Sequence, residues 1–308
     1  MDYSGRSHIS RFRHSLALVG SLAGLVALAI AAPTPASAAT GTISVSGTVS
    51  CQSHPVEGVW VESGGGGSGW ASWQPLDSRH TNIATYAAKI QNTTLPTNIR
   101  LHVGCGGSAT AWWSDNETGS TSEAGGALTG STSSLNAVCN EGTVQPAAGD
   151  NERCWYGYAS AAAAWAITHL SGPGADHAIS GSDLVTDAST YNSWYGMCLA
   201  FADSAYLNAQ QGAWPSPTVS GPSASAMGMY NLYKADGLIH SASEIPPVGA
   251  LVFYPGENHI GIAVGIDNKG NYDVISATET GSPLVQQQPY NKFNSPYAGW
   301  AYPSTAYR

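Results

Sequence analysis

Two residues in the second half of the chain have the types and settings of a nucleophile and its base. Cys198 follows Gly196 in the segment WYGMCLAFADSAY, where we expect a helix to begin. The partial positive charge at a helix N-terminus favours a thiolate and lowers the pKa of a thiol placed there. His259 lies in the segment GENHIGIAVG, at the start of a predicted strand. A cysteine nucleophile needs a partner that holds a proton for the leaving group, and His259 can fill that role.

The cysteine count also singles out Cys198. The chain has five cysteines, and we expect the first two and the next two to form disulfides, Cys51–Cys105 and Cys139–Cys154. An odd cysteine in an exported protein is either an intermolecular link or a reactive thiol. No cysteine lies in a metal-binding spacing, so we expect neither a metal nor another cofactor. The alternative is that Cys198 is a buried structural cysteine with no catalytic histidine.

A third group should orient the histidine. Pairing of the predicted strands 259–266 and 272–277 is expected to set Ser276 opposite His259. A serine hydroxyl can accept the second N–H of the imidazole ring. Thr278 shares the face of Ser276 and is an alternative. Glu279 would replace both if a bulge shifted the register.

An acyl-transfer site also needs donors for an oxyanion. Met197, directly before the nucleophile, cannot donate a hydrogen bond. Tyr195 is therefore the candidate that would assist the backbone N–H of Cys198. On the other side of the nucleophile, we interpret Asp203 as a solvated surface charge.

The elements around these residues predict an α+β domain over residues 151–308. Apolar and alanine-rich stretches predict helices first, at 154–170, 197–211 and 223–235. Alternating and continuous apolar runs then predict strands at 250–254, 259–266 and 272–277. Helices followed by an antiparallel sheet are typical of the α+β class.

The first part of the chain predicts a separate small β-sandwich at residues 39–111. Apolar residues alternate along two stretches, and each stretch ends in a cysteine on its apolar face, Cys51 or Cys105. The segments SGTVSC and HPVEGVWVES resemble Ig-like or transthyretin-like β-domains. Five tryptophans are candidates for a sugar-binding surface or, alternatively, for core packing: Trp60, Trp70, Trp73, Trp112 and Trp113. Residues 112–150, rich in Ser, Thr and Gly, predict a linker.

Residues from about 190 to 303 resemble the CHAP domain (cysteine, histidine-dependent amidohydrolase/peptidase) and its NlpC-type relatives. The matching segments are YGMCLAF, PPVGALVFY, HIGIAVG and the terminal YAGWAYPS. The resemblance implies a papain-like thiol hydrolase fold, with helices packed on an antiparallel sheet, and places the nucleophile at Cys198 and the base at His259. It also implies cleavage of amide bonds in the peptide part of peptidoglycan, by an endopeptidase or an N-acetylmuramoyl-L-alanine amidase. Met197 departs from the family, in which Gln is common before the nucleophile.

Two other functions stay open. An enzyme of similar fold could transfer the acyl group to an amine, so that it would cross-link its substrates rather than cleave them. The enzyme-like domain could also have lost activity and serve a secreted binding or adhesion protein.

The composition limits the partners. Charged residues make up 10% of the chain, against roughly 25% in an average protein, and the formal net charge is −9. A nucleic-acid ligand needs clustered basic groups, so we expect no nucleic-acid partner. We also expect the protein to be a monomer.

The N-terminus predicts export. Arg6, Arg11 and Arg13 precede an apolar run at 16–32 and the small-residue sequence Ala36-Ser37-Ala38. This order is typical of a secretory signal peptide at residues 1–38; a membrane anchor is the alternative. We therefore expect a secreted, extracellular or cell-wall-associated protein without a membrane partner after signal cleavage.

Overall fold

The computed structural model describes residues 40–118, 128–139, 152–170, 194–209, 225–278, 284–293 and 295–303. The predicted signal peptide lies outside these residues. Residues Ala38–Arg308 form one compact unit. No helix in the described ranges has the length and apolar character needed to cross a membrane.

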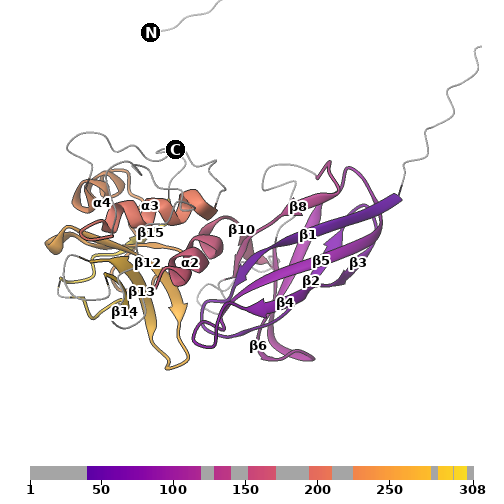
Figure 1. Cartoon of the computed structure of the whole chain (residues 1–308), viewed down its shortest axis with the longest axis horizontal. Coiled ribbons are helices and arrows are strands. Elements are labelled where there is room, and N and C mark those ends of the chain that lie inside the picture. The colour runs from indigo at the N-terminus through magenta and orange to yellow at the C-terminus, as the bar shows by residue number, and fades with distance from the viewer. Residues whose placement is uncertain are drawn as a thin grey trace, which may run out of the picture. The chain divides into compact units, whose positions relative to one another are not determined.

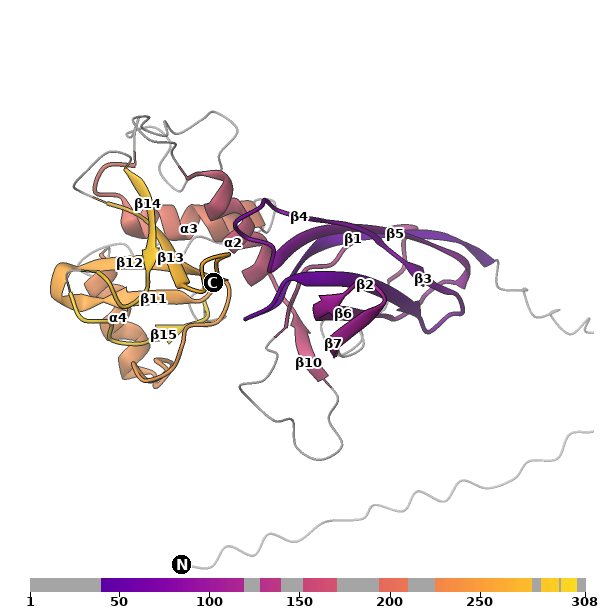
Figure 2. The same cartoon turned by 90° about the horizontal axis from the view of Figure 1, so that it is seen from below.

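The expected α+β, papain-like fold is wrong. Of the described residues, 47% are strand and 18% helix, and the main feature is a nearly closed mixed sheet of ten strands, nine of which follow one another in a continuous order. The residues expected to form a linker supply part of this sheet, so strands continue well beyond the predicted sandwich (Figures 1 and 2). The helices are a minor addition to a mostly β chain.

The larger sheet has the order β3-β2-β6-β7-β10-β9-β1-β5-β4, with β8 paired to β1. Its strands are β1 (Thr40–Ser50), β2 (Val56–Ser63), β3 (Ser68–Trp70), β4 (Ser72–Pro75), β5 (Ile83–Thr94), β6 (Ile99–Ser108), β7 (Ala111–Thr118), β8 (Thr132–Ser134), β9 (Ala137–Cys139) and β10 (Glu152–Tyr156). The β10–β7, β1–β8 and β1–β9 pairs are parallel and the others antiparallel. Alternation along the strands turns one set of apolar side chains inward, as the sequence pattern indicates.

Both predicted disulfides are present. Cys51 bonds Cys105, and Cys139 bonds Cys154, with Cα–Cα distances of 5.9 and 4.0 Å. The second disulfide joins β9 to β10, where Cys154 and Cys139 are directly paired. Residues 154–156 are therefore strand rather than the start of the predicted helix, because cross-strand pairing and the disulfide hold them extended.

The second sheet carries the predicted histidine strand. Its order is β14-β13-β12-β11-β15, and its strands are β11 (Leu251–Tyr254), β12 (His259–Ile266), β13 (Tyr272–Ala277), β14 (Val285–Pro289) and β15 (Trp300–Ala301). A 3-10 turn, η1 (Pro255–Glu257), joins β11 to β12. Three helices complete the described chain: α2 (Ala159–Thr168), α3 (Cys198–Ala209) and α4 (Ala226–Ala235).

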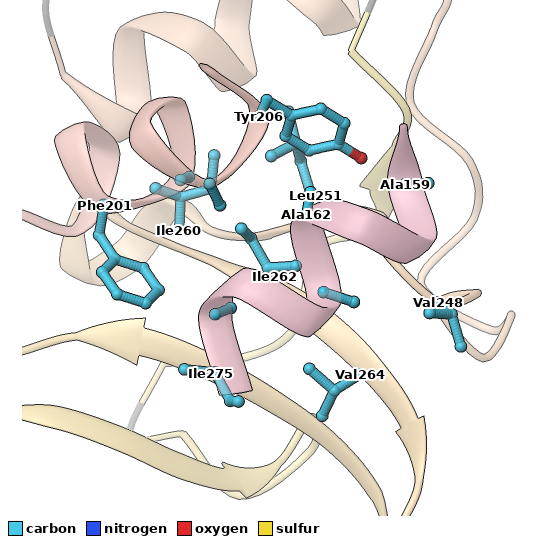
Figure 3. Packing of buried hydrophobic residues seen from close by; sticks show 14 of the residues in the cluster. Ala159, Ala162, Phe201, Tyr206, Val248, Leu251, Ile260, Ile262, Val264 and Ile275 are labelled. Atoms are coloured by element: carbon cyan, nitrogen blue, oxygen red, sulfur yellow. The ribbon is translucent and has the colours of Figure 1, made fainter. Parts of the chain in front are cut away.

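The three helices pack on one face of this sheet (Figure 1). Figure 3 shows the shared core, in which Phe201 and Tyr206 of α3 face the apolar side chains Ile260, Ile262 and Ile275. Alanines on α2, such as Ala162, let this helix lie close to its neighbours. Burying this apolar surface holds the start of α3 and the start of β12 in a fixed relation.

Candidate functional site

Cys198 is the first residue of α3, as the sequence predicts. All five cysteines are described, and Cys198 is the one outside the two disulfides. The turn before it is held by Gly196, which has a left-handed φ of 67° and donates its backbone N–H to the carbonyl of Thr278 at 3.1 Å. Trp194 and Phe201, both fully buried, anchor the turn and the helix with an edge-to-face contact. The half-buried thiol therefore sits at the positive end of a 12-residue helix.

The chain segment that leads to His259 lies against this thiol. The Sγ atom of Cys198 lies 3.8 Å from the carbonyl oxygen of Asn258. Asn258 has a left-handed φ of 52°, and its side chain accepts the backbone N–H of Met227 at 2.7 Å. Asn258 thus contacts the Cys198 thiol, tethers the first turn of α4 and directly precedes β12. Asn258 was not among the residues predicted from the sequence; its one signal was the Asn-His pair after the Gly-containing turn.

His259 contacts the predicted third residue. Its Nε2 atom lies 2.6 Å from the hydroxyl oxygen of Ser276, which is fully buried. This contact occupies Nε2 and leaves Nδ1 as the ring atom that can exchange a proton with a thiol. For that exchange the ring proton must lie on Nε2 and be donated to Ser276.

A bulge in β12 produces this contact, and the predicted direct pairing is wrong in register. Ile266 pairs with Tyr272, and regular pairing from there would set His259 opposite residue 279. The register shifts between Ala263 and Gly265, so that Ile262 pairs with Ile275. Because side chains alternate along a strand, this one-residue shift moves Ser276 to the face that carries His259.

The diagonal contact between His259 and Ser276 also needs Gly261. A Cβ atom at Gly261 would lie 2.4 Å from Cγ1 of Val274 and 3.1 Å from Cβ of Ser276. Both distances are shorter than a normal carbon–carbon contact. A side chain at this position would therefore displace Ser276 from the imidazole.

The alternative orienting residues are placed differently. The hydroxyl of Thr278 donates to the carbonyl of Leu284 at 3.1 Å, so this hydrogen bond is made to the residue that precedes β14 rather than to the histidine. Glu279 lies outside the described residues. Tyr195 is 62% exposed and lies on the turn directly before α3.

Neighbouring aromatic side chains help to bury His259, and this burial lowers the pKa of its imidazole. The ring centroid of Phe293 lies 5.5 Å from the imidazole, and that of the buried Tyr254 lies 6.1 Å away. Burial disfavours the charged imidazolium and lowers the pKa of His259 to about 4. The ring is thus neutral at physiological pH and able to accept a proton.

Asp203 is not the solvated charge that the sequence suggested. Its side chain is half-buried on α3, five residues after the nucleophile. Burial raises the pKa of its carboxyl to about 8, so the group is mostly protonated at neutral pH. No other residue in the described ranges pairs with this carboxyl.

No family model, curated protein or solved structure matches this chain. What the site can do therefore rests on its own residues. A thiol at a helix start, against the residue that precedes a neutral imidazole hydrogen-bonded to a buried serine, has the groups needed for nucleophilic attack with general acid–base help.

Proposed function

We propose that the chain is a secreted cysteine amidohydrolase or peptidase that cleaves amide bonds in the peptide part of peptidoglycan. The observation that carries this proposal is the arrangement of Cys198, the Asn258–His259 segment and Ser276. The thiol lies against the residue that precedes the histidine, and the histidine is hydrogen-bonded to a buried serine. The mostly β fold does not itself indicate an activity, so the proposal depends on this site.

The proposed acylation step begins with proton transfer. The thiol proton of Cys198 passes to Nδ1 of His259, and the sulfur bonds to the carbonyl carbon of the scissile amide. Backbone N–H groups in the first turn of α3, together with the Tyr195 hydroxyl, stabilise the resulting oxyanion. The imidazolium then gives its proton to the amide nitrogen. The C–N bond breaks, the amine leaves, and a thioester remains on Cys198.

Hydrolysis of the thioester uses the same groups, with His259 again acting first as a base and then as an acid. His259 takes a proton from a water molecule, and the oxygen of that water bonds to the thioester carbon. The C–S bond then breaks, and the thiolate recovers the proton from the imidazolium. The product leaves as a carboxylic acid, which loses its proton to solvent. Ser276 keeps the ring orientation through both steps by accepting the Nε2–H.

The substrate class comes from the resemblance of residues 190–303 to CHAP and NlpC-type domains. The acidic composition fits a substrate other than a nucleic acid. The predicted export signal fits a substrate outside the cell.

Digestion of purified peptidoglycan tests the proposal. The full chain should release soluble fragments with new amino and carboxyl ends, and their masses should identify the bond that is cut. The isosteric variant Cys198→Ser should release none. Fragments that carry new reducing sugar ends instead would contradict the proposal, because they would show cleavage of the glycan. Equal release by the wild type and Cys198→Ser would also contradict it.

A further inference from the structure

The outer face of the larger sheet carries an aromatic cluster that the proposed hydrolysis does not use. Trp60 and Trp70 are paired across β2 and β3, with ring centroids 5.2 Å apart. Trp112 lies 5.4 Å from Trp70, and the two rings are nearly perpendicular. Trp70 is 61% exposed, which is unusual for so large an apolar side chain. We call Trp60, Trp70 and Trp112 the tryptophan patch.

Two glycines make room for this patch. A Cβ atom at Gly104 would lie 2.0 Å from the Trp112 ring, and one at Gly58 would lie 2.5 Å from it. The indole of Trp112 therefore lies directly on the backbone of β2 and β6. Packing over these glycines explains why Trp112 is half-buried, but it does not explain why Trp70 stands exposed beside it.

Polar groups border the patch on the same face. Glu62 accepts a hydrogen bond from the indole N–H of Trp60 at 3.2 Å, and its side chain is 48% exposed. His102 is paired directly with Trp60 and lies 3.3 Å from the carboxylate of Asp115. Arg100, which is paired with Glu62 across β2 and β6, forms an ion pair with Glu117.

We propose that the tryptophan patch binds a neutral polysaccharide built of β-linked pyranose rings. Such rings present a flat face of C–H bonds, which is attracted to the electron-rich face of an indole, and an edge of hydroxyls. The patch has a group that matches each of these: exposed indole surface for the C–H face, and neighbouring carboxylates that accept hydrogen bonds from the hydroxyls. Glu62 and Asp115 repel phosphate and sulfate groups. The same carboxylates would be costly to cover with an apolar protein surface.

The proposal is independent of the proposed hydrolysis, and its test keeps the two apart. The full chain carrying Cys198→Ser is incubated with insoluble chitin and with insoluble cellulose, and the unbound protein is measured. We expect retention on at least one polymer, and we expect it to resist added salt because no ion pair forms. Trp70→Ala, in the same background, should weaken retention about tenfold, whereas Trp70→Phe should weaken it less.

Trp155→Ala is the matched control. Trp155 is 38% exposed, lies on β10 and packs against Tyr302, outside the tryptophan patch. Its replacement should leave retention unchanged, and the melting temperature of each variant shows that it is folded. Three outcomes would overturn the proposal. They are no retention on either polymer, equal retention by the Trp70→Ala variant, and a dimer in solution that Trp70→Ala converts to a monomer, which would assign the patch to self-association.

Discussion

Asn82 holds the bulge that brings Ser276 to His259. Its side-chain amide donates to the carbonyl of Val264, at the centre of the bulge in β12, with an Nδ2–O distance of 3.1 Å. Asn82 precedes β5 of the larger sheet and is itself buried. A Cβ atom at Gly265 would lie 2.5 Å from the same Nδ2 atom. A residue of the larger sheet thus fixes the register of the strand that carries the candidate base.

Replacement of Asn82 should therefore affect the candidate site as well as stability. Asn82→Ala removes hydrogen bonds to the carbonyls of Cys51 and Val264. We expect the free energy of unfolding to fall by about 1–3 kcal/mol and peptidoglycan release to fall further than in a control of equal stability. Asn116→Ala is that control, because Asn116 is also buried in the larger sheet but bonds to Val103 and Ser114. Equal activity of the two variants would show that the bulge does not depend on Asn82.

Ser276 should contribute through the histidine alone. Ser276→Ala removes the acceptor of the Nε2–H. We expect turnover to fall roughly tenfold to a hundredfold, which is the usual loss when a residue that orients a functional side chain by a hydrogen bond is removed. Thr278→Ala should have a much smaller effect, since that hydroxyl bonds to Leu284. If Ser276→Ala is silent and Glu279→Gln abolishes turnover, then Glu279 is the orienting group. Turnover of purified peptidoglycan fragments is the measurement.

The glycine beneath this contact offers a second test of the same geometry. Gly261→Ala would place a methyl group against Val274 and Ser276. We expect it to reduce turnover to the level of Ser276→Ala or below. Gly41→Ala serves as the control, because a Cβ atom there meets nothing within 4 Å.

The lowered pKa of His259 predicts how stability depends on pH. The imidazole titrates near 6.5 in the unfolded chain and at about 4 in the folded chain. Between these values the unfolded state binds more protons, so the free energy of unfolding should decrease as the pH falls from 6.5 toward 4. His259→Gln should flatten this part of the curve, measured by urea unfolding at several pH values. A parallel curve for the variant would show that the folded imidazole titrates normally.

Asp203 should make the free energy of unfolding depend on pH in the opposite direction. Its carboxyl titrates near 3.8 when unfolded and at about 8 when folded. The folded state therefore binds more protons between these values, and the carboxyl destabilises the fold increasingly as the pH rises from 4 to 8. Asp203→Asn should raise the melting temperature, with a gain that grows over this range. A gain that is constant or absent would contradict the burial of the charge.

A fragment that begins near Gln145 should not fold. It would retain the second sheet and the three helices, but it would lose the partners of β10, namely β7 and β9. It would also lose the hydrogen bond from Ser160 on α2 to the carbonyl of Thr48. The side chain of Gln52, which donates to the carbonyl of Pro246 and accepts the backbone N–H of Val248, would be lost as well. We expect no cooperative unfolding transition and no selective labelling of Cys198 by iodoacetamide. A fragment that melts cooperatively and labels like the full chain would show that the second sheet is an independent domain.

The sequence alone identified the local features of the candidate site. Cys198 was predicted at a helix start and His259 at a strand start because both depend on short-range patterns of glycine, apolar residues and turns. The Cys51–Cys105 pairing followed in the same way, since alternation along a strand decides which face a cysteine occupies. These signals lie within about ten residues of the side chain concerned.

Only the tertiary structure decided the fold class and the strand register that brings the predicted Ser276 to the histidine. The composition of residues 112–150 suggested a linker, because they are rich in Ser, Thr and Gly. The described part of this stretch instead supplies most of β7 and all of β8 and β9, because neighbouring strands provide their hydrogen bonds and the Cys139–Cys154 disulfide ties β9 to β10. The position of Ser276 depends on a bulge whose carbonyl is held by Asn82, 182 residues away in the chain. A one-residue change of register leaves the local sequence pattern unchanged but reverses the face of every side chain that follows it. Long-range contacts therefore determine which residue meets the imidazole.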